Sequence, residues 1–175
     1  MTRYLEHMCY RGLTIYKLVL KFMLRGHNQR EVKMANVFDV AQYILHKQGT
    51  MTTMKLQKLV YYCQAWALVW DAKPLFAGPI QAWASGPVVP SLYNIHRGKF
   101  EIDSLSVGNQ DKLEKYEKDT IKAVLGHYGS KEAQWLSDLS HLEKPWKEAR
   151  KGKNPGENCT KEISYAAMVE YYSSL

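Results

Sequence analysis

Histidine and cysteine are the side chains of this 175-residue chain that could ligate a metal or act as nucleophiles. The six histidines contain no His-x-x-x-His or His-Glu-x-x-His spacing, which would place two ligands on one face of a helix. Cys9, Cys63 and Cys159 lie far apart and form no Cys-x-x-Cys pair, the usual sign of a zinc or redox site. Cys63 falls on an apolar helical face, where a free cysteine is more often a small buried hydrophobe than a nucleophile. The sequence therefore predicts no bound metal.

The sequence also shows no pattern typical of a nucleotide site or of a complete catalytic group. Gly126 and Gly129 do not form the Gly-x-Gly-x-x-Gly or Gly-Lys-Ser/Thr patterns that aim backbone amides at phosphates. Asp138 and His141 are three residues apart on one expected helix, close enough to hydrogen-bond, but no nucleophile accompanies them. We therefore expect no cofactor and no enzymatic activity.

Aromatic residues are the unusual part of the composition, with 12 Tyr, 5 Trp and 4 Phe. Trp66 and Trp70 fall on one helical stripe and are expected in the core. Tyr and Trp are also enriched at the energetic centres of protein–protein interfaces. Composition does not separate these two uses, so the interface candidates among the aromatic residues remain open: Tyr61, Tyr62, Tyr93, Trp146, Tyr171 and Tyr172.

The net charge of +7 is concentrated at the N-terminus. Residues 1–33 hold seven Lys or Arg against two Glu, a net of +5, which leaves only +2 for residues 34–175. A nucleic-acid-binding domain needs a concentrated basic stripe to neutralise phosphates. The nearly neutral body therefore argues against nucleic acid as the partner.

The most apolar stretch of the chain, Leu13–Leu24, is interrupted by Lys17 and Lys21 and is shorter than the roughly 18 apolar residues of a membrane span. No small-residue cleavage site follows it. We expect no membrane segment and, with an odd number of cysteines, a cytoplasmic protein. Two interpretations of residues 1–33 stay open: a basic amphipathic helix that docks on a partner or membrane surface, or an extension translated upstream of the natural start.

Helical periodicity dominates residues 34–175 and predicts a mainly α fold, a single compact helical domain with five to seven helices. Asn36 is expected to cap the first helix, and Thr52 or Thr53 the second, which is the expected core helix. Glycines and prolines of residues 78–90 forbid a long helix and predict a short β-hairpin or ribbon near residues 80–84. Residues 100–107 are a second candidate to pair with that strand. The predicted helices cover residues 37–47, 53–70, 91–96, 110–128, 130–139 and 164–172, with another short helix whose first turn holds Pro145.

Two ordered runs carry a family resemblance. Residues 54–66 (MKLQKLVYYCQAW) followed by residues 80–93 (IQAWASGPVVPSLY) resemble the phage-associated GepA and SocA-like antitoxin family, also called the Panacea domain. The resemblance covers residues 34–175. It implies an antitoxin that neutralises a cognate toxin by direct binding or, as in the SocA branch, delivers the toxin to a protease as an adaptor. It brings no catalytic residues.

The polar residues of these runs are the expected contacts with a toxin. Lys55, Gln57, Lys58, Tyr61 and Gln64 fall on the flanks of the second helix that its apolar stripe leaves free. Gly86 and Pro87 predict a rigid turn beside it, and a pre-organised surface loses less entropy on binding. We predict that the toxin binds exposed side chains of this region: Lys55, Lys58, Tyr61, Trp83 and Tyr93. The alternative is a phage- or mobile-element-associated nucleic-acid-binding regulator that uses residues 1–33.

Overall fold

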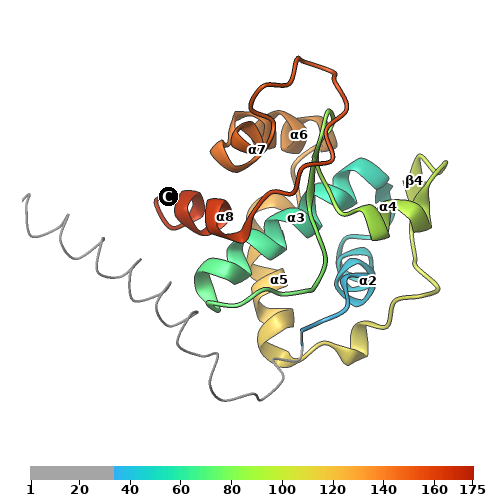
Figure 1. Cartoon of the computed structure of the whole chain (residues 1–175). Coiled ribbons are helices and arrows are strands. Elements are labelled where there is room, and N and C mark those ends of the chain that lie inside the picture. Colours follow the sequence, from blue (N-terminus) through green and yellow to red (C-terminus); the bar gives the residue numbers. More distant parts are fainter. Residues whose placement is uncertain (1–33) are drawn as a thin grey trace, which may run out of the picture. The chain divides into compact units, whose positions relative to one another are not determined.

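The structure, a computed structural model, describes residues 34–175. This range forms one of the two units into which the chain divides. The expected basic extension 1–33 and its helix Leu13–Leu24 lie outside the described residues. Seven α-helices and two small antiparallel sheets of two strands make up the described unit, which confirms the mainly α prediction (Figure 1). The helices are α2 (Val37–Gln48), α3 (Thr53–Trp70), α4 (Pro90–His96), α5 (Lys115–Tyr128), α6 (Ala133–Leu142), α7 (Lys144–Ala149) and α8 (Tyr165–Tyr172).

The first two helices begin where their capping residues predict. The Asn36 side chain accepts a hydrogen bond from the Phe38 backbone N–H at 3.0 Å. The Thr52 hydroxyl accepts one from Lys55 at 3.2 Å. Each cap satisfies a backbone donor that the first helical turn leaves free.

Helix α3 is the centre of the fold and packs against α2, α5, α6 and α8. Every residue from Leu56 to Ala65 is buried, so this stretch has no solvent-facing side. The expectation that the apolar stripe continues to Trp70 in the core is wrong. Trp70 lies in the last turn, stacks on Trp66 with ring centroids 4.8 Å apart, and keeps 49% of its surface exposed.

The predicted hairpin is formed by β2 (Gln81–Trp83) and β3 (Gly86–Val88), with Trp83 opposite Gly86. The expectation that residues 100–107 could pair with the strand near residues 80–84 is wrong. The other edge of β2 is occupied by residues 161–163: Ala82 donates to the Lys161 carbonyl oxygen at 2.9 Å, and Gln81 bridges to Glu162. Strand β4 (Glu101–Ile102) pairs instead with β1 (Met51–Thr52).

Helix α5 starts five residues later than the apolar pattern of residues 110–128 indicates. Residues Gln110–Lys112 form a short 3₁₀ turn, and α5 begins at Lys115. Glu114 and Glu117 exchange side-chain and backbone hydrogen bonds in a capping box. This reciprocal cap fixes the start of the helix.

Gly86 and Gly78 offer a matched test of the hairpin turn, because both have positive φ (101° and 111°). A Cβ on Gly78 would meet nothing within 4 Å, whereas one on Gly86 would lie 2.7 Å from Lys58 Nζ. That amine is buried and hydrogen-bonded, so it cannot move aside freely. Gly78→Ala should cost about 1–2 kcal/mol of stability through backbone strain, and Gly86→Ala about 1–3 kcal/mol more. Denaturant unfolding measures both, and equal losses would contradict the prediction.

Candidate functional site

Two of the five predicted contact residues lie inside the protein. Lys58 is 1% exposed and Tyr61 is 0% exposed, so the expectation that these side chains face a partner directly is wrong. The reason is that α3 is surrounded on all sides. The flank that its apolar stripe leaves free faces the β2–β3 hairpin and α8 rather than solvent.

Lys58 binds the hairpin turn. Its amine donates to the carbonyl oxygens of Ser85 at 2.7 Å and Pro87 at 3.2 Å, and it makes no ion pair with a described carboxylate. Burial lowers the pKa of Lys58 from 10.5 to about 7. A neutral amine has two N–H donors, which match these two acceptors.

Two glutamines of α3 bind backbone in the same way. The Gln57 amide accepts from Val89 N–H at 2.8 Å and donates to the Val89 carbonyl oxygen at 3.3 Å. The Gln64 amide accepts from the N–H groups of Leu75 and Phe76, at 3.0 and 3.1 Å, and donates to the Phe76 carbonyl oxygen at 3.1 Å. Both side chains thus hydrogen-bond the backbone of extended segments in the way a neighbouring strand would. Gln57 also contacts His96 Nε2 at 2.9 Å, in α4.

Tyr61 belongs to a buried network around Glu143. The Tyr172 hydroxyl donates to Glu143 Oε2 at 2.6 Å, and the Tyr62 hydroxyl donates to the same atom at 3.4 Å. The hydroxyl oxygens of Tyr172 and Tyr61 are hydrogen-bonded at 3.1 Å. Burial raises the pKa of Glu143 to about 7, against the two hydroxyl donors, which lower it. This network ties α8 to α3 and to the junction of α6 and α7.

The other predicted residues, Lys55, Trp83 and Tyr93, are half-buried. Trp83 of β2 and Tyr93 of α4 meet edge to face with ring centroids 4.8 Å apart. The Trp146 indole N–H of α7 donates to the Trp83 carbonyl oxygen at 2.9 Å. His141 of α6 stacks on Trp146 at 4.3 Å. We call these four half-buried rings, Trp83, Tyr93, His141 and Trp146, the aromatic face. Lys55, in the first turn of α3, makes no side-chain contact with it among the described residues.

His141 is the member of the aromatic face that the sequence analysis considers only beside Asp138, and not as an interface residue. Burial and the charges of Lys58 and Arg150 lower the pKa of His141, although Asp138 opposes them. The lowered pKa favours the neutral form of the ring, which stacks on Trp146. Its contact depends on the turn between α6 and α7, which no spacing rule reveals.

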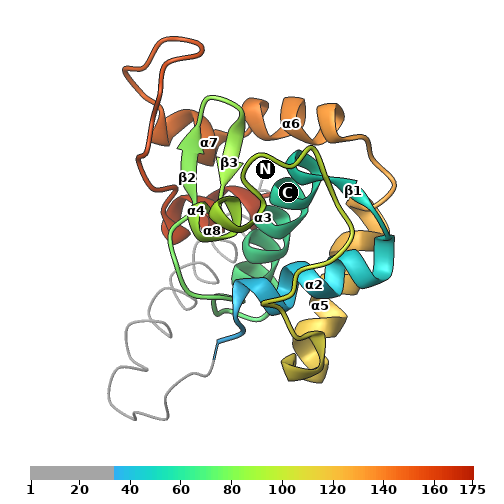
Figure 2. The ribbon, with the colours of Figure 1, turned by 90° about the vertical axis from the view of Figure 1, so that its right-hand side faces the viewer.

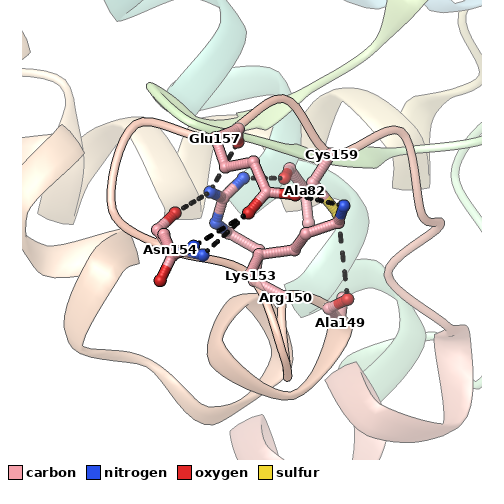
Figure 3. Close-up of polar contacts among 7 residues, drawn as sticks. All are labelled: Ala82, Ala149, Arg150, Lys153, Asn154, Glu157 and Cys159. Carbon is pink, nitrogen blue, oxygen red and sulfur yellow. Dashed lines mark hydrogen bonds and ion pairs between the residues drawn. The ribbon is translucent and has the colours of Figure 1, made fainter.

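Arg150 holds the loop beside this face (Figure 3). Its buried guanidinium donates to the carbonyl oxygens of Ala82, Asn154 and Glu157, at 2.9, 3.2 and 2.8 Å. It also lies over the Trp146 ring, 5.0 Å from the centroid. Residues 150–157 are thereby fixed against β2, where Figure 2 shows this loop next to the hairpin and α7.

Metal binding and membrane insertion find no support in residues 34–175. No group of three or more His, Cys, Asp or Glu side chains in this range could hold a metal ion. No helix in the same range is long and apolar enough to cross a membrane.

Comparison with known protein families decides the class of the protein. The model of the SocA-like antitoxin, Panacea domain, family matches residues 56–147, just over half of the chain. The chain belongs to this family. The family is non-enzymatic. Membership in it makes the chain an antitoxin of a toxin–antitoxin system, a protein that binds a cognate toxin. The matched residues run from α3 to α7 and include the whole aromatic face. No curated protein and no solved structure matches the chain significantly.

The buried amine of this Panacea domain predicts a pH dependence of stability. Between pH 7 and 10.5 the unfolded chain holds the Lys58 proton and the folded chain does not, so stability rises with pH. From pH 7 to pH 9, Lys58 should add about 2 kcal/mol to the free energy of unfolding. Lys58→Met should remove this increment and cost stability at pH 9. Denaturant unfolding of both proteins at the two pH values measures it, and an identical pH increment in the two would contradict a largely neutral amine.

Proposed function

We propose that this antitoxin neutralises its toxin by direct binding at the aromatic face. The observation that carries the proposal is that four rings from β2, α4, α6 and α7 remain partly exposed on segments held rigidly from below. Trp83 and Tyr93 are the proposed central contacts, with Lys55 as a peripheral one. Lys58 and Tyr61 are buried and support the face indirectly. Lys58 holds the hairpin turn, and Tyr61 helps to hold α8 through its hydrogen bond with Tyr172.

Pre-organisation favours this face over other exposed apolar residues. Gln57 and Lys58 hold the hairpin and the start of α4, while Arg150 holds β2 from the other side. A surface already in its bound geometry loses little conformational entropy on association. Tyr and Trp at the centre of an interface carry a large share of the binding energy. Phe100, by contrast, is 79% exposed and directly precedes the two-residue strand β4, outside the segments that Gln57, Lys58 and Arg150 hold.

Direct inhibition and delivery to a protease both begin with this complex. We propose inhibition by occlusion as the main mode, because binding at the aromatic face needs no second partner. Adaptor activity would appear as a fall in toxin level that disappears in cells lacking the protease. The phage or mobile-element association that the GepA resemblance implies would appear in the neighbouring reading frames.

Trp83→Ala and Tyr93→Ala test the location of the interface. Each should weaken binding of the toxin encoded by the neighbouring reading frame by about 1–3 kcal/mol, roughly 5- to 150-fold in Kd. The same variants should lose protection when co-expressed with the toxin. Calorimetric titration and growth assays measure the two effects.

Phe100→Ala is the control, because it removes a more exposed aromatic ring outside the face. It should leave Kd and protection unchanged. Circular dichroism and melting temperature show that each variant is folded. If Trp83→Ala and Tyr93→Ala both fold and bind with wild-type affinity, the interface lies elsewhere.

A further inference from the structure

Positive charge is concentrated in one of the segments that build the aromatic face. Residues 144–162, which run from α7 through the loop held by Arg150 to the segment paired with β2, carry six Lys or Arg and three Glu, a net of +3. Residues 34–175 as a whole carry only +2. The charge of the described unit is therefore unevenly distributed along the chain, and its excess lies in the segment that contains Trp146 and pairs with β2.

Most of the acidic groups in this segment are already paired. Glu148 pairs with Lys144, which also binds Glu170, and Glu157 pairs with Lys153. Arg150 is buried and bound to carbonyl oxygens. Glu162, next to Lys161, is the one acid of the segment without an ion pair among the described residues.

Three exposed lysines remain, and each is tied by its backbone position to the aromatic face. Lys147 directly follows Trp146 in α7, and Lys151 directly follows Arg150. The backbone carbonyl of Lys161 accepts the Ala82 N–H at 2.9 Å, one residue before Trp83. None of the three makes an ion pair with a described residue. We call Lys147, Lys151 and Lys161 the lysine rim.

We propose that the toxin surface docking on the aromatic face is acidic, with carboxylates that meet the lysine rim. This inference rests on the proposed function, since it concerns the partner of the same face. An apolar aromatic centre with a charged border is the usual arrangement of a specific interface. Exposed charges at such a border act mainly on the rate of association, through long-range steering that salt screens.

The test measures association and dissociation rates for the full-length antitoxin and its purified toxin, by surface plasmon resonance at 50 and 300 mM salt. The association rate of the wild type should fall by about tenfold or more between these salt concentrations. The triple variant Lys147→Glu, Lys151→Glu, Lys161→Glu should associate at least about tenfold more slowly at 50 mM salt, with a small or reversed salt dependence.

A matched control carries the same change in net charge elsewhere: Lys47→Glu, Lys112→Glu, Lys118→Glu. These residues belong to α2, the 3₁₀ turn and α5, away from the hairpin and α7 in Figure 2. Its association rate should stay within about threefold of the wild type, because salt screens charges that lie far from the interface. An equal loss of association rate in both triple variants would mean that net charge alone acts. It would overturn the proposal that the lysine rim meets the toxin.

The outcomes separate this inference from the proposed function. If Trp83→Ala weakens binding while the lysine-rim variant associates normally or faster, the proposal of an acidic toxin surface is wrong. The proposal that the toxin binds the aromatic face is then retained. If Trp83→Ala and Tyr93→Ala leave binding intact, the proposed function fails at this face, whatever the lysines do. The proposal of an acidic toxin surface would also be overturned if a DNA fragment bound the wild type but not the lysine-rim variant, while toxin association stayed unchanged.

Discussion

The fold depends on one constraint: the polar side chains in the enclosed stretch of helix α3 must find hydrogen-bond partners inside the protein. Leaving a buried polar group unpaired costs more than a typical hydrogen bond contributes. From Leu56 to Ala65 helix α3 has no exposed residue. Gln57, Lys58 and Gln64 accordingly bind the backbone of segments that pass beside it. These side chains connect a helical core to the irregular segments of the surface.

Those segments could not hold their shape alone. The β2–β3 hairpin has three residues in each strand, and α4 has seven residues, lengths that are marginal in isolation. Lys58 and Gln57 fix them from the α3 side, and Arg150 binds the backbone of β2 from the loop after α7. The aromatic face therefore rests on short elements whose geometry the core determines. A binding surface built in this way can be rigid without lying on long secondary structure.

Two buried ionisable groups contribute opposite pH dependences to this core. Burial raises the pKa of Glu143 to about 7, so between its ordinary value of 4.5 and pH 7 this group lowers stability as pH rises. Burial lowers the pKa of Lys58 to about 7, so above pH 7 that group raises stability. Both shifts have the same physical cause, which is the cost of a charge out of water. The charges that remain fully solvated, such as the lysine rim, lie outside the core.

Local sequence determined much of this protein. Helical periodicity, the caps Asn36 and Thr52, and the glycines and prolines around Gly86 predict the elements, since these signals act within a few residues. The two runs that contain Lys58 and Trp83 also indicate the Panacea family. Only the tertiary structure decided which polar residues of α3 meet solvent. A lysine or tyrosine on the free flank of a helix has the same local pattern whether the next element covers it or not. For Lys58 and Tyr61, the hairpin and α8, distant in sequence, close over that flank and turn expected contact residues into supports for the surface above them.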